Sequence, residues 1–130
     1  MAAGIPGHAP LQLTAQTAAA TSFTGPASGW VPESCEFAQI TSSSSAKFII
    51  LSDKIEIGRM IMLTVGSNGY KLGTPAGSSL TINNVDTSGG TASAAIPANT
   101  TQMIVRTLST GFILSNYTNL GAVATAIVPS

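Results

Sequence analysis

The chain has 130 residues, with five basic and five acidic side chains and a formal net charge of zero. Charged residues make up 8% of the sequence, whereas a typical soluble domain carries about 25%. Binding nucleic acid phosphates needs clustered Lys and Arg, so five scattered cations exclude a nucleic-acid groove. The surface must instead be covered by uncharged polar side chains or by partner proteins, because a surface that lacks charge is poorly soluble.

The first 29 residues differ in composition from the rest of the chain. Ala, Thr, Ser, Gly, Gln and Pro dominate residues 1–29, and such a segment buries too little apolar surface to fold alone. It is therefore either disordered or laid across another surface. Pro6, Pro10 and Pro26 limit the entropy that the segment would lose on being ordered against a partner. We predict an extended N-terminal arm over residues 1–29 and one β domain over residues 30–130.

The start of the chain lacks both the basic region and the apolar region of a secretory signal. The longest apolar runs are far below the roughly 18 residues that span a bilayer. We therefore expect a product that is made in the cytoplasm, is kept there or leaves it only by lysis, and has no membrane partner.

From Trp30 onward, apolar residues alternate with period two between clusters of Gly, Pro, Asn and Ser. The pattern predicts eight short strands, at 31–40, 46–52, 59–65, 70–73, 79–83, 103–108, 112–117 and 122–128. Turn residues at 67–69 and 109–111 predict two hairpins. No 11-residue window after residue 30 shows the apolar spacing of a helix. The predicted fold is all-β, a small antiparallel sandwich or barrel.

Four of these strands are apolar on both faces, at 48–51, 60–63, 103–105 and 112–114. Only one face of a strand in a small sandwich can point at its own core, so the other face must meet water or a neighbour. We therefore infer that subunits pack through their sheets in a homo-oligomer with closed cyclic symmetry.

The side chains that usually carry catalysis are sparse. His8 is the only histidine and lies in the arm, whereas a metal site needs three or four convergent ligands. Cys35 is interpreted as a small buried thiol, and Glu33 and Glu36 as solvated carboxylates beside a turn. No nucleophile elbow, phosphate loop, dinucleotide fingerprint or cysteine pair is present. We predict that the chain is not an enzyme and binds no cofactor and no metal.

A few other features allow two interpretations. Residues 53–59 alternate charged and apolar side chains, which favours a solvated turn over a salt-bridge patch between subunits. Trp30 is interpreted as an anchor that packs the arm down rather than as a ligand platform. Tyr70 and Tyr117 are ordinary strand residues, although either could line a sugar-binding shelf.

Several short motifs follow one another between residues 57 and 117. They are Ile57-Gly-Arg-Met-Ile-Met-Leu-Thr-Val-Gly, Gly69-Tyr-Lys-Leu, Pro75-Ala-Gly-Ser-Ser-Leu-Thr-Ile-Asn-Asn84, Ala95-Ile-Pro-Ala98 and Gly111-Phe-Ile-Leu114. Together they resemble a pattern common in small tailed-phage virion proteins, in which Gly-bearing turns, an Ile-Pro-Ala step and a final aromatic-containing hairpin succeed one another. Phe112 stands where such modules often carry Trp. The resemblance covers about half of the chain.

The resemblance implies a trimeric β module located on the surface of a virion. Such modules serve as capsid decoration (cement) proteins or as head-fibre parts of a bacteriophage, and the partner implied is the major capsid protein. An oligomer would sit where several capsid subunits meet and would stabilise the shell. We expect the partner contacts to include Leu11, Leu13, Phe23, Trp30 and Ile113.

Two other functions remain open from the sequence. A receptor- or glycan-binding fibre or tail module is suggested by Tyr70, Tyr117 and the loops rich in Asn and Thr. A major coat protein of a small RNA-containing particle would need a basic genome-facing surface, and five scattered cations argue against it.

Overall fold

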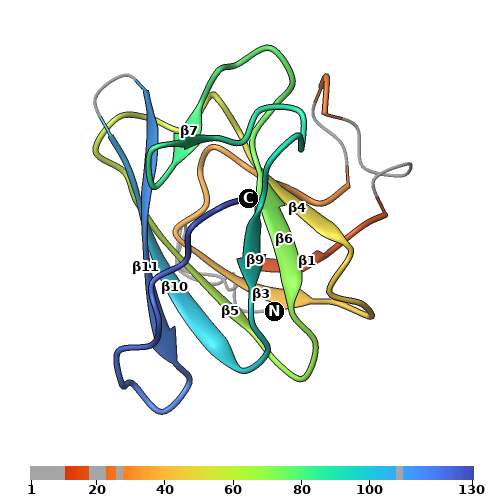
Figure 1. Cartoon of the computed structure of the whole chain (residues 1–130), viewed down its shortest axis with the longest axis vertical. Coiled ribbons are helices and arrows are strands. Elements are labelled where there is room, and N and C mark those ends of the chain that lie inside the picture. The colour runs from red at the N-terminus through yellow and green to blue at the C-terminus, as the bar shows by residue number, and fades with distance from the viewer. Residues whose placement is uncertain (1–10, 18–22, 26–27, 108–109) are drawn as a thin grey trace, which may run out of the picture.

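The computed structural model describes residues 11–17, 23–25, 28–107 and 110–130. Within these ranges the chain forms eleven β-strands and no helix. The strands make two sheets that face each other as an open sandwich rather than a closed barrel (Figure 1). The all-β prediction is therefore confirmed for the described part of the chain.

The larger sheet holds seven strands in the order β1-β3-β5-β10-β11-β7-β8. Their bounds are β1 Leu11–Thr14, β3 Phe37–Thr41, β5 Met60–Val65, β10 Thr100–Arg106, β11 Gly111–Thr118, β7 Thr81–Ile82 and β8 Val85–Asp86. The smaller sheet holds four strands in the order β2-β4-β6-β9. Their bounds are β2 Trp30–Val31, β4 Phe48–Leu51, β6 Tyr70–Gly73 and β9 Ala94–Ile96.

The first six strands alternate between the two sheets. Each connection crosses from one sheet to the other, so a strand two elements later returns to the first sheet running in the same direction. Consequently β1, β3 and β5 pair in parallel, and so do β2, β4 and β6. The prediction of an antiparallel sandwich is wrong for this part of the chain. The antiparallel pairs are β5–β10, β10–β11, β7–β8 and β6–β9, so both sheets are mixed.

The two predicted hairpins have different outcomes. The turn at 67–69 joins β5 of the larger sheet to β6 of the smaller one, so it is not a hairpin. Gly69 lies so close to the backbone of β9 that a Cβ there would clash with the carbonyl oxygen of Ile96. By contrast, β10 and β11 do pair as antiparallel neighbours around residues 109–111, which confirms the second hairpin.

The core lies between the two sheets and is filled by inward-facing aliphatic side chains from both. It also contains a buried polar chain. The Tyr70 hydroxyl donates to Gln102 Oε1 at 3.3 Å, and Gln102 Nε2 donates to Thr100 Oγ1 at 2.8 Å and to Asn116 Oδ1 at 3.0 Å. Tyr70 is 1% exposed, and burial raises the pKa of its phenol above the usual range. Tyr70 therefore cannot line a sugar-binding shelf.

The predicted strand at 122–128 is wrong, because the segment pairs with β11 only at an isolated antiparallel bridge between Val123 and Tyr117, and side chains hold the residues that follow. Asn116 Nδ2 donates to the Thr125 carbonyl at 3.0 Å, and Asn83 Nδ2 donates to the Ile127 carbonyl at 2.9 Å. Ser130 then exchanges two backbone hydrogen bonds with Ser93 next to β9. The segment thus runs from β11 toward β9 across one side of the sandwich (Figure 1).

The described residues of the predicted arm lie on the β domain. Residues 11–14 form β1 at one edge of the larger sheet, and Gln16 forms an isolated bridge with Phe48 of the smaller sheet. Phe23 packs against the outer face of the smaller sheet. His8 and the other residues at 1–10, 18–22 and 26–27 lie outside the described residues. Contact between the arm and another protein stays a prediction.

Candidate interaction surfaces

The outer face of the larger sheet carries rows of apolar side chains, because residues paired across adjacent strands share a face. One row runs across β5, β10 and β11, and the next extends over β3 as well. We call the six apolar residues of these rows the methionine face: Phe37, Met60, Met62, Met103, Val105 and Ile113.

The methionine face is open to solvent. Met60 is 55% exposed, Ile113 56% and Met62 37%, and the adjacent Ile57 is 56% exposed. Three of the four methionines of the chain lie here, and methionine side chains adapt readily to a partner surface. Contiguous exposed apolar side chains on a soluble protein mark interaction sites.

The methionine face ends sharply at a polar row. The next residues along the same strands are Thr64 and Thr101, with Gln39 on one side and Tyr117 on the other. The Thr101 hydroxyl donates to Asn119 Oδ1 at 2.6 Å, and Thr64 Oγ1 lies 3.0 Å from Thr101 Oγ1. The apolar area is thus a bounded patch rather than a general property of the sheet.

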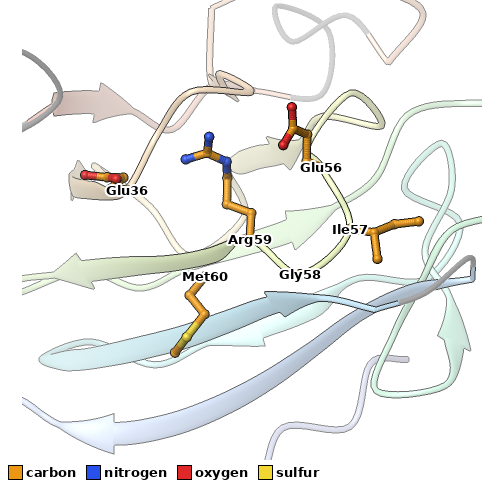
Figure 2. Close-up of a pocket in the computed structure, with 6 residues that line it drawn as sticks. All are labelled: Glu36, Glu56, Ile57, Gly58, Arg59 and Met60. Atoms are coloured by element: carbon orange, nitrogen blue, oxygen red, sulfur yellow. The ribbon is translucent and has the colours of Figure 1, made fainter.

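A hollow of about 510 Å³ with charged walls borders the other end of the methionine face (Figure 2). Its lining residues are Glu36, Glu56, Ile57, Gly58, Arg59 and Met60. The Arg59 side chain extends toward the region between the two carboxylates, and its Nε atom is buried with no hydrogen-bond partner in the described part of the chain. The patch therefore has a rim of mixed charge, which is typical of protein interfaces.

Residues 53–59 form the turn that leads from β4 to β5, as predicted. Asp53, Lys54 and Glu56 are exposed there. Cys35 is a buried free thiol. Burial raises its pKa, and the nearby Arg59 partly offsets this effect.

The outer face of the smaller sheet is covered by the chain itself. All four residues of β4 are buried, because Phe48 and Ile50 pack with Trp30 and Phe23 in a second apolar cluster. The Phe23 and Phe48 rings meet edge to face with centroids 5.4 Å apart. The expectation that the second face of residues 48–51 meets water or a neighbour is therefore wrong, because Phe23 and Trp30 of the same chain cover this face.

An apolar pocket of about 350 Å³ opens between β1 and β2. We call it the β1 pocket, and its lining residues are Leu11, Leu13, Trp30, Val31, Pro32, Glu33, Ser52 and Lys54. Three of the predicted contact residues, Leu11, Leu13 and Trp30, come together here. Phe23 and Trp30 also line a neighbouring pocket of about 210 Å³.

The fifth predicted contact residue, Ile113, lies on the methionine face and shares no surface with the other four. Phe37, Met60, Met62 and Met103 are not among the contact residues predicted from the sequence. The signal that could have found three of them was the apolar character of both faces of strands 60–63 and 103–105.

The part of the chain that the structure describes offers no metal centre. No group of three or more His, Cys, Asp or Glu side chains there could hold a metal ion. Nor do these residues include a helix that is long and apolar enough to cross a membrane.

No protein-family model, no curated protein and no solved structure matches the chain. The resemblance to small tailed-phage virion modules therefore stays a hypothesis that depends on the motifs between residues 57 and 117. The methionine face and the β1 pocket are the features from which function is inferred.

Proposed function

We propose that the chain is a structural virion protein, an oligomeric capsid decoration (cement) protein that binds the assembled shell and stabilises it. The observation that supports this proposal is the methionine face, a solvent-exposed apolar patch on a chain with 8% charged residues. A monomer would leave this patch in contact with water, where it favours non-specific association. A defined partner is therefore required.

A second copy of the chain is the partner proposed for the methionine face. Interfaces between identical subunits have an apolar centre that is rich in Met and aromatic residues, and charged residues are restricted to the rim. The patch has this composition, with Phe37 and three methionines in its rows and with Glu36, Glu56 and Arg59 at its border. Closed cyclic symmetry would cover every copy equally, and we favour a trimer.

Attachment to the shell would then use surfaces that the oligomer leaves free. The β1 pocket shares no residue with the methionine face, so each copy in an oligomer presents its own pocket to a larger scaffold. Several weak attachments made at once bind far more tightly than one attachment alone. Such multivalent binding would let a small chain clamp neighbouring shell subunits.

The experiment adds the purified chain to assembled shells that lack it and measures co-sedimentation and the thermal stability of the shells. We expect saturable binding and a higher melting temperature of the shell. The comparison variant is Met60→Glu, which should weaken both the binding to shells and their thermal stabilisation, because it separates the oligomer into single copies. A chain that is monomeric at high concentration and does not bind shells contradicts the proposal. Binding to cells or glycans without shell binding would support the receptor-binding alternative instead.

A further inference from the structure

The four edges of the two sheets differ in how they are protected against further strand pairing. Strands β8 and β2 have only two residues each, and Pro32 follows β2 directly. Strand β9 has three residues, is followed by Pro97 and lies beside the Ser93–Ser130 backbone pair. By contrast, β1 has four residues, Leu-Gln-Leu-Thr, with no charge and no proline among them, and Pro10 directly precedes it in the sequence. Natural proteins protect exposed edges with short strands, charges, prolines or covering segments, and β1 is longer than the other three edge strands and has neither a charge nor a proline within it.

The backbone of β1 points hydrogen-bonding groups away from the sheet. The Ala15 N–H donates to the Thr41 carbonyl at 2.9 Å, toward β3. Because successive residues of a strand point to opposite sides, the N–H and C=O of Gln12 face the open edge. Gln16 Nε2 donates to the Thr14 carbonyl at 3.1 Å and so satisfies the next outward carbonyl within the chain. Among the described residues of β1, Gln12 is therefore the one whose N–H and C=O are both open to another strand.

The β1 pocket lies directly beside this edge. Leu11 and Leu13 project from β1 into its wall, and Trp30 and Val31 line it from β2. Its volume of about 350 Å³ is within the range of sites that bind small apolar groups. Glu33 and Lys54 contribute one charge of each sign, so the pocket favours neither a cationic nor an anionic partner segment.

We propose that the β1 edge and the β1 pocket together bind an extended segment of a partner protein. The segment adds as a strand beside Gln12, and one of its large apolar side chains enters the pocket between Leu11, Leu13 and Trp30. Strand addition gives affinity through main-chain hydrogen bonds and specificity through pockets for alternate side chains. Under the proposed function the partner is a shell subunit, and only the partner's identity rests on that function.

A second copy of the chain is a poor occupant of this site. Its own β1 edge would present Leu11 and Leu13, but these side chains are half-buried against the core of their own subunit. They cannot enter a neighbour's pocket without leaving that core. An extended segment with an unanchored apolar side chain has no such cost.

The test uses the fluorescence of Trp30, which is the only tryptophan of the chain and lines the pocket. The probe is an uncharged heptapeptide with blocked ends, made of threonines and serines around one central leucine. We expect a saturable change in Trp30 emission, and binding at least about tenfold weaker when the central leucine is replaced by alanine. The same peptide with N-methyl groups on alternate amides should not bind.

Two variants of the protein separate strand pairing from pocket filling. Gln12→Pro removes the outward N–H at an edge position that tolerates proline, so peptide binding should be lost while the melting temperature stays near that of the wild type. Gln12→Ala keeps the N–H and should bind as the wild type does. Equal binding by Gln12→Pro, or equal affinity for the leucine and alanine peptides, overturns the proposal.

The shell assay distinguishes this proposal from the proposed function. If shells bind the wild type and Gln12→Pro equally, the strand-addition site is wrong although the decoration function stands. If the peptide binds as expected but shells do not, the site stands and the decoration function is wrong. A change in Trp30 emission when the oligomer dissociates without peptide means that a second copy fills the pocket, which also overturns the proposal.

Discussion

Replacing Met60 by glutamate should dissociate the oligomer without unfolding the subunit. Met60 is 55% exposed in the isolated chain, so a glutamate there remains solvated in the monomer and should change the free energy of unfolding by less than about 0.5 kcal/mol. In an oligomer that buries the methionine face, the same carboxylate loses its water. The variant therefore separates the stability of the subunit from that of the assembly.

The size of the effect follows from the exposed fraction of the side chain. Fully burying a methionine contributes about 1.5–3 kcal/mol, so burying the exposed half of Met60 contributes about 1 kcal/mol. Placing an unpaired carboxylate in an apolar contact adds several kcal/mol of desolvation. Together these effects give at least about 4 kcal/mol, which corresponds to a roughly 1,000-fold increase in the dissociation constant.

Sedimentation equilibrium measures this change, with thermal unfolding of each variant as a check on the fold. The matched control is Gln39→Glu, which places the same charge on the same sheet face but in the polar row outside the patch. It should leave the mass of the assembly unchanged. The reasoning is refuted if Met60→Glu keeps the wild-type mass, or if both variants dissociate equally.

Three further predictions concern the folded subunit. Burial raises the pKa of Tyr70, so the stability that its protonated phenol contributes is full below about pH 10 and is lost as the pH rises further. The melting temperature should therefore fall between about pH 8 and pH 11.5, and this fall should be smaller in Tyr70→Phe. The buried Cys35 thiol should react with a thiol reagent only as fast as the chain unfolds, and rapid labelling of the native protein contradicts its burial. A Cβ at Gly111 would clash with the backbone of Thr81, so Gly111→Ala should lower the free energy of unfolding by about 2–3 kcal/mol in denaturant titrations. The matched control is Gly66→Ala, which should leave the free energy of unfolding nearly unchanged because a Cβ at Gly66 meets open space.

The sequence predicted local strands better than their partners. The strands expected at 59–65, 70–73 and 112–117 are present within one or two residues, because alternation and turn residues report on each segment by itself. Alternation carries no information on which sheet a strand joins. The turn at Asn68 therefore predicted a hairpin, although it joins two different sheets. The segment at 122–128 also alternates, but it pairs with β11 only at the isolated bridge between Val123 and Tyr117, and the side chains of Asn83 and Asn116 hold the residues that follow.

The sequence predicted that exposed apolar surfaces exist, but it did not predict where on the fold they lie. The methionine face depends on the register between β5 and β10, which pair Met62 with Met103 across 40 residues of sequence. The same double-sided apolar pattern at Phe48 has the opposite outcome, because Phe23 and Trp30 cover it from within the chain. Sequence patterns show that a second apolar face exists. Tertiary structure decides whether the chain covers that face or leaves it for a partner.

The methionine face should be covered when the protein is assembled. Methionine oxidation by dilute hydrogen peroxide, followed residue by residue with mass spectrometry, tests it directly. Met62 and Met103 should oxidise at least about tenfold more slowly in the assembled wild type than in the dissociated Met60→Glu variant. Equal oxidation rates in the two proteins would contradict the account, because they would show that the face stays open to solvent.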